Sequence, residues 1–178
     1  MSRWRTRSSR SSAHMHARVV KPRNGPTLLV RPLRHGDVRT VMNVFERLGE
    51  RSRRARFNGP KPCLSVSELR WLASVDRTRR ALVAYVEGDP QPVAIARLVR
   101  EGRSAEIAFA VADDHQRRGI GSALAAELVA DARASGITEI TALVSSDNPA
   151  ALALLRRIAN VFDIRRAGPE LSIRAAIA

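Results

Sequence analysis

Cysteine is almost absent from this sequence of 178 residues, in which Cys63 is the single example. One cysteine can form neither an intrachain disulfide nor a thiolate metal cluster, so we expect no metal site and a reducing, cytoplasmic setting. No histidine lies near Cys63 in a recognisable arrangement. We therefore expect this residue to be a small, partly buried apolar side chain rather than a nucleophile.

Long hydrophobic runs and aromatic residues are also scarce. No stretch approaches the roughly 20 consecutive apolar residues that a membrane-spanning helix needs, and the basic amino terminus lacks the apolar segment of a secretory signal. Aromatic residues make up 4% of the chain, which leaves few flat surfaces on which nucleic-acid bases could stack. These absences predict a soluble protein with no membrane partner, and they disfavour nucleic acid as a partner.

Acidic residues are outnumbered, with 17 Asp and Glu against 31 Lys and Arg, so the net charge is +14. Residues 1–24 carry seven of these positive charges and no acid, which leaves +7 for the remainder. This tail is rich in Arg and Ser without apolar periodicity, so we expect it to be disordered, followed by one domain over residues 25–178. The excess charge suits an anionic ligand such as a nucleotide diphosphate as well as nucleic acid.

Hydrophobic periodicity predicts a domain of mixed helices and strands. A helix should begin after Asp37 and end before Gly49, and another, with Trp71 in the core, should span residues 67–75. A basic segment at residues 51–57 is either a short helix or a loop. Later helices are expected from Gly119 to Ser135 and after Asn148, and strands at residues 27–32, 81–86, 92–99, 105–112, 139–145, 161–164 and 171–173. This order is typical of an α/β or α+β sheet covered by helices.

One motif has the properties of an anion-binding loop. It reads Gln116-Arg117-Arg118-Gly119-Ile120-Gly121-Ser122 and lies between a predicted strand and a predicted long helix. Glycines let the backbone approach a ligand closely, and the free amides and positive dipole end of the helix's first turn favour phosphate. Arg117 and Arg118 add positive charge.

Two common nucleotide-binding motifs fit this loop poorly. The dinucleotide fingerprint needs a small residue where Leu124 stands, and a P-loop needs Gly-Lys-Ser or Gly-Lys-Thr, which the chain lacks.

The loop resembles the central signature of the GCN5-related N-acetyltransferase (GNAT) family, Gln/Arg-x-x-Gly-x-Gly/Ala, at every position from Gln116 to Gly121. The resemblance extends to residues 107–111 before the loop and 148–152 after it, and covers roughly residues 27–175. Within the family, Arg31-Pro32, Ser52 to Phe57 and Ala105-Glu106 look like the catalytic domain of bacterial protein lysine acetyltransferases. The family's fold is a mixed, mostly antiparallel sheet of six to seven strands flanked by helices.

The resemblance implies a binding site for acetyl-CoA as co-substrate. Backbone groups of Phe109, Ala110 and Val111 would pair with the pantetheine arm as another strand would. The pyrophosphate would lie on the signature residues Gln116, Arg117, Arg118, Gly119, Ile120, Gly121 and Ser122. Asn148 would either contact the CoA arm or simply cap the helix that follows it.

The chemistry that the resemblance implies is the attack of a neutral amine on a thioester, which needs a base for the amine proton. Glu106 is the best candidate for that base, because it lies on the strand expected to hold the thioester; the alternative is a solvated carboxylate. Many relatives carry a tyrosine as the general acid where this chain has Leu155, so the acid stays unassigned. Many also end with Leu-Gly-Phe where this chain has Ile158-Ala159-Asn160.

Three functions remain open from the sequence. The first is acyl transfer to a protein lysine or amino terminus, and the second is acyl transfer to a small amine. The third is non-catalytic binding of acyl-CoA or of nucleic acid, with the basic tail as the working part. The sequence does not choose between a monomer and a homodimer.

Overall fold

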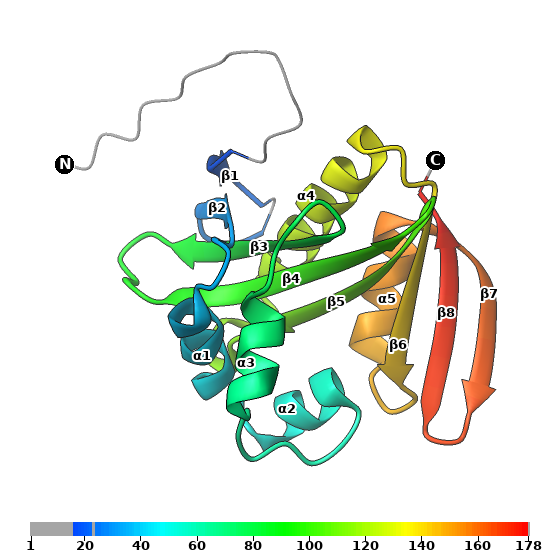
Figure 1. The fold of residues 1–178 in the computed structure, drawn as a ribbon, viewed down its shortest axis with the longest axis horizontal. Coiled ribbons are helices and arrows are strands. Elements are labelled where there is room, and N and C mark those ends of the chain that lie inside the picture. Colours follow the sequence, from blue (N-terminus) through cyan, green and yellow to red (C-terminus); the bar gives the residue numbers. More distant parts are fainter. Residues whose placement is uncertain (1–15, 23, 178) are drawn as a thin grey trace.

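The structure is a computed structural model that describes residues 16–22 and 24–177, and its centre is one eight-stranded sheet (Figure 1). The strand order is β1-β2-β3-β4-β5-β6-β8-β7, and every neighbouring pair is antiparallel except β5 and β6. The strands are β1 (Arg18–Val20), β2 (Leu28–Pro32), β3 (Arg79–Val86), β4 (Pro92–Glu101), β5 (Ser104–Val111), β6 (Glu139–Ser145), β7 (Asn160–Ala167) and β8 (Glu170–Ala176). The mixed, mostly antiparallel fold is confirmed, with one strand more than expected.

Helices cover both faces of the sheet (Figure 1). They are α1 (Val38–Glu46), α2 (Glu50–Phe57), α3 (Val66–Ala73), α4 (Ile120–Ala134) and α5 (Pro149–Ile158), with a 3-10 turn at Asp113–His115. The larger core joins α4 and α5 to one face through residues such as Ile107, Leu124 and Leu155. The smaller core joins α1 and α3 to the other face through residues such as Val44, Leu72 and Ala110. Alternate residues of β5 therefore point to different helices.

The tail prediction is wrong for the residues nearest the domain. Residues 18–20 form β1, which pairs with β2 in the register Arg18↔Val30 to Val20↔Leu28. Arg18 also forms ion pairs across the sheet edge with Glu127 at 2.6 Å and Asp131 at 2.7 Å, both on α4. Composition alone could not reveal a strand held by carboxylates more than 100 residues away. Most of the predicted tail, residues 1–15 and residue 23, lies outside the described residues.

The prediction that Trp71 belongs to the core is also wrong. Its side chain is 53% exposed, whereas Arg97 on β4 is 3% exposed. The Arg97 guanidinium lies 4.8 Å from the centre of the Trp71 ring and donates to the carbonyl of Leu72. Burial lowers the pKa of Arg97 to about 10. The Trp71 indole therefore packs over the buried Arg97 guanidinium and shields it from solvent. The cation–π contact replaces part of the hydration that Arg97 has lost.

Two further observations bear on expectations from composition. Cys63 is exposed rather than partly buried. None of the helices in the described part of the chain is long and apolar enough to cross a membrane.

Candidate active site

The neighbouring strands β5 and β6 separate where the CoA arm was expected. They pair in parallel only from Ser104↔Glu139 to Glu106↔Thr141. Beyond Glu106, β5 continues to pair with β4, and β6 continues to pair with β8. Within the described residues, the β6-facing edge of β5 from Ile107 to Val111 thus has no strand partner. Backbone N–H and C=O groups need partners when they are covered, so this edge can accept an extended ligand as an added strand.

The loop after β5 has a backbone suited to anions. Arg117 and Gly119 have positive φ values of 58° and 75°, whereas Arg118 between them does not. Such alternation turns successive backbone N–H groups toward one point, as in anion-binding nests. Gly119 is the N-cap of α4 and forms no side-chain cap, and the helix has no acidic residue in its first turn. The amides of Ile120, Gly121 and Ser122 and the positive dipole end are therefore left for a ligand.

The side chains of the loop have separate roles. Ile120 is 1% exposed and packs in the core, so it can contribute only its backbone to a ligand. Ser122 accepts a hydrogen bond from Arg157 on α5 at 3.3 Å between Nη1 and Oγ. Arg157 therefore brings a further positive charge to the helix start. The sequence pattern did not single out Arg157, because only the packing of α5 beside α4 brings it close.

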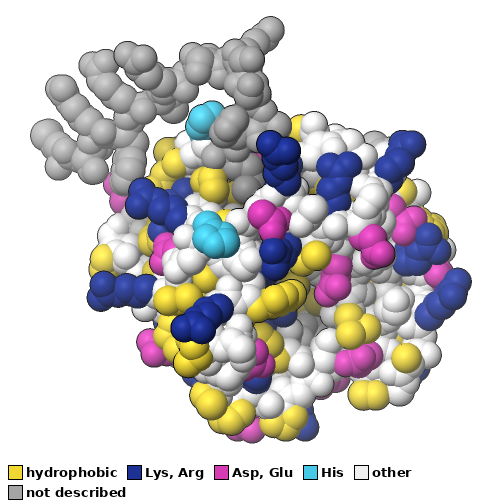
Figure 2. Space-filling view, viewed as in Figure 1, with side chains coloured by type: hydrophobic (Ala, Val, Ile, Leu, Met, Phe, Trp, Pro, Cys, Tyr) yellow, Lys and Arg dark blue, Asp and Glu magenta, His cyan; other side chains and the backbone are white. Residues whose placement is uncertain are grey.

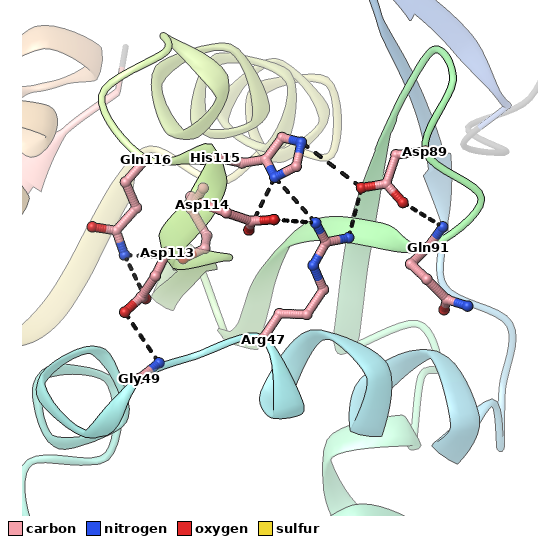
Figure 3. A network of polar contacts seen from close by, with 9 residues as sticks. Arg47, Gly49, Asp89, Gln91, Asp113, Asp114, His115 and Gln116 are labelled. Atoms are coloured by element: carbon pink, nitrogen blue, oxygen red, sulfur yellow. Dashed lines mark hydrogen bonds and ion pairs between the residues drawn. The ribbon is translucent and has the colours of Figure 1, made fainter.

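Gln116 connects the loop to the opposite side of the sheet. Its amide nitrogen donates to Ser52 Oγ at 3.0 Å, to Asp113 Oδ1 at 3.0 Å and to the carbonyl of Val111 at 3.1 Å. Asp113 in turn accepts from the backbone amide of Gly49 at 3.1 Å, immediately before α2 (Figure 3). The first residue of the signature thus links the end of β5 to α2 through its side chain.

A charged network supports the turn that precedes the loop (Figure 3). Arg47, at the end of α1, donates to Asp89 at 2.8 Å and to Asp114 at 2.7 Å. His115 is 9% exposed, and its Nδ1 lies 3.0 Å from Asp114 Oδ1 and 3.2 Å from Arg47 Nη2. One guanidinium therefore holds together α1, the β3–β4 turn and the turn that leads into the loop.

We expect Arg47→Met to lower the free energy of unfolding by about 2 kcal/mol, because half-buried Asp89 loses a charged hydrogen-bond donor. Urea denaturation measures this change. The matched control is Arg79→Met, which breaks an exposed pair with Asp76 and should cost less than about 1 kcal/mol. Equal losses in the two variants would show that the Arg47 network adds nothing beyond a surface ion pair.

The same network predicts a pH dependence of stability. Hydrogen bonds from His115 and Arg47 lower the pKa of Asp114 from 3.8 to about 2. A carboxyl group whose pKa is lower in the folded state stabilises the fold above its unfolded pKa. This contribution should thus be complete above pH 4 and disappear as the pH falls toward about 2. As the pH falls from 4 to 2, the free energy of unfolding of Asp114→Asn should therefore fall less than that of the parent protein. Parallel plots of this free energy against pH for the two proteins would contradict the prediction.

Glu106 lies on the face of β5 opposite the larger core. Its neighbours Ala105 and Ile107 are buried toward α4, so Glu106 points to the side covered by α2, where it is exposed. Arg56 of α2 is close enough for its charge to interact with Glu106: burial lowers the pKa of Arg56, and the Glu106 carboxylate opposes that shift. The candidate base thus stands at the last paired position before β5 and β6 separate.

Comparison with known proteins places this geometry in a family. Residues 44–159 match the model of the acetyltransferase (GNAT) family, which is more than half of the chain. The chain belongs to the GNAT family. Acetyl-CoA is the co-substrate of that family, and the resemblance drawn from the signature at Gln116–Gly121 is confirmed at this level.

Specific relatives of this GNAT chain include the acetyltransferase Pat of Mycolicibacterium smegmatis, which is 35% identical over 148 residues. That match covers 80% of the chain but 44% of Pat, so the chain spans less than half of that relative. The acetyltransferase PA5475 of Pseudomonas aeruginosa is 31% identical over 132 residues, 71% of each protein. Among solved structures, the GNAT domain of S. lividans PAT has a TM-score of 0.79 at 26% identity, covering 90% of this chain and 96% of that domain.

Two residues singled out by the GNAT resemblance, Asn148 and Leu155, stabilise the fold around α5. The Asn148 side chain accepts from the backbone amide of Ala151 at 3.1 Å, so it is the N-cap of α5. Leu155, in the place of the family's tyrosine, is 3% exposed and packs in the larger core. The structure therefore adds no candidate for the general acid at that position.

Ile158-Ala159-Asn160 stands where many relatives have Leu-Gly-Phe. An open cavity of about 390 Å³ lies at this place, between α5 and β7. Its lining is formed by the end of α5 and the start of β7, from Arg156 to Ile164. The candidate residues of the loop and of β5 do not line it, and neither does Glu106. The candidate active site is therefore the open edge between β5 and β6 rather than this cavity.

Proposed function

We propose that this chain transfers an acetyl group from acetyl-CoA to an amine, and that the amine belongs to a protein lysine or amino terminus. The observation that carries the proposal is the end of β5–β6 pairing at Glu106, beside a loop with free helix amides. An exposed strand edge and an anion site within one short segment match the two parts of CoA, the pantetheine arm and the pyrophosphate. The likeness of the chain to protein lysine acetyltransferases supports a protein acceptor.

In the proposed reaction, a neutral amine attacks the thioester carbon and forms the new C–N bond. The C–S bond then breaks, and CoA leaves as the thiolate. Glu106, directly or through one water, takes the proton that the amine must lose. Phe109, Ala110 and Val111 would hold the arm through their backbone groups. The Val111 carbonyl already accepts a bond from Gln116, and its second lone pair is left for the ligand.

Arg117, Arg118 and Arg157 would neutralise charge on the pyrophosphate, while the amides of the first turn of α4 would bind its oxygens. On the face in Figure 2, Lys and Arg side chains are spread out and interleaved with Asp and Glu. On this face the described side chains form no continuous basic stripe of the kind that a nucleic acid follows.

The experiment for this proposal is incubation of the full chain with acetyl-CoA and a panel of proteins, peptides and small amines. Release of free CoA and the mass of each acceptor are measured. We expect acetylation of lysine or amino-terminal amines in proteins or peptides. Acetylation of small amines alone would instead indicate a small-molecule amine acetyltransferase. Absence of transfer to every acceptor would contradict the proposed activity.

A further inference from the structure

Pro22, Asn24 and Gly25, which lie between β1 and β2, cross directly over the anion-binding loop. A methyl group placed on Gly25 would lie 2.1 Å from the carbonyl oxygen of Arg118, and one placed on Gly119 would lie 2.9 Å from the carbonyl oxygen of Asn24. The Cβ of Pro22 is 3.5 Å from that second position. Two backbones thus touch at two glycines, with the Pro22 ring beside them.

The crossing segment is anchored on both sides of the loop. Toward β2, it is held by the antiparallel pairing of residues 18–20. Toward α4, Arg18 is held by Glu127 and Asp131, one helical turn apart on the helix that begins at the loop. The side chain of Asp131 is 15% exposed and that of Glu127 is 24% exposed, so this contact is better shielded than an ordinary surface pair.

The loop needs support from outside itself. Arg117 has a left-handed conformation, which costs an ordinary residue about 1 kcal/mol or more. Gly119 forms no side-chain cap, so the backbone at the start of α4 is not fixed by its own N-cap. A strained backbone persists only where its surroundings hold it, and Pro22, Asn24 and Gly25 are part of those surroundings.

We propose that the N-terminal segment, residues 18–22 with Asn24 and Gly25, positions the phosphate-binding loop. It holds residues 117–119 in the conformation that presents their amides to the pyrophosphate, with Gly25 as the positioning residue. This inference rests on the proposed function, since it assigns the loop to the pyrophosphate of acyl-CoA. The contacts behind this inference are with the Arg118 carbonyl and with Gly119, so the segment is proposed to act on the ligand through the loop.

The test is Gly25→Ala, with binding of CoA and of pantetheine measured by calorimetry on the full chain. The added methyl group must push the Arg118 carbonyl away, so CoA affinity should fall by about tenfold, the effect of losing one charge-assisted hydrogen bond. Pantetheine has no pyrophosphate, so its affinity should not change. The matched control is Gly59→Ala, because Gly59 has ordinary φ and open space around it. This control should bind both ligands as the parent does.

Arg18→Met provides a second route if Gly25→Ala does not fold. It removes the anchor on α4 without adding bulk at the loop. It should also lower the affinity for CoA and leave the affinity for pantetheine unchanged. The inference is overturned if the folded variants bind CoA as tightly as the parent. It is also overturned if their affinities for CoA and for pantetheine fall by the same factor. A parent protein that binds no CoA would instead overturn the proposed function itself, and the inference with it.

Discussion

Glu106→Gln should lower turnover by about 100-fold or more on a confirmed acceptor, the usual effect of losing a positioned general base. Glutamine keeps the size of the side chain but cannot take the amine proton. Because Glu106 is exposed on the α2 side of β5 rather than in the core, the fold should be unaffected. CoA affinity should also be unchanged, because the loop lies at the far end of β5. Steady-state kinetics and CoA calorimetry measure the two effects separately.

The pH profile distinguishes this role from a structural one. The rate of the parent should rise with pH, and in Glu106→Gln this rise should flatten or move toward the pKa of the acceptor amine. Glu101→Gln is the matched control, since Glu101 is an exposed carboxylate at the end of β4, paired with Ser104. Full activity of Glu106→Gln would assign proton removal to water or to the acceptor.

Gly121→Leu should weaken CoA binding by on the order of 100-fold while the protein stays folded. Gly121 has ordinary φ, and a methyl group there would lie 3.4 Å from the Val111 side chain, an acceptable contact. A leucine side chain would add bulk at the first turn of α4, where the phosphate is expected. Two charge-assisted hydrogen bonds are worth about 3 kcal/mol together, which corresponds to this loss of affinity.

Gly59→Leu is the matched control for that experiment, because it adds the same side chain in open space outside the loop. Calorimetry should show unchanged CoA affinity for it. A substitution at Gly119 would test the loop less clearly than one at Gly121. Its positive φ and its contact with Asn24 would strain any larger residue whether or not a ligand binds. Normal CoA affinity in Gly121→Leu would remove the first turn of α4 from the proposed site.

The part of the fold around the candidate site could be predicted because its signals are local. Turn residues separate β3, β4 and β5, and the alternation in β5 places Glu106 on the face opposite Ile107. The glycines of the signature mark where α4 begins, and Asn148 followed by Pro149 marks the start of α5. Each of these features depends on neighbours within a few residues, so the pattern predicts it without knowledge of the rest of the chain.

What could not be predicted depends on contacts between distant segments. β1 has only three residues and is stabilised by Arg18 through carboxylates on α4. Trp71 was expected to be buried because large aromatic residues usually are, but here it covers the buried cation of Arg97. The bond between Gln116 and Ser52 joins residues 64 positions apart. No periodicity in the sequence indicates these pairs.

Calorimetric titration of the parent chain with CoA and with pantetheine under the same conditions tests whether the loop binds the pyrophosphate. Much of the affinity is expected to come from the loop from Gln116 to Ser122, which is assigned to the pyrophosphate. CoA should therefore bind at least about 100-fold more tightly than pantetheine. Equal dissociation constants for the two ligands would contradict the assignment of this loop to the pyrophosphate.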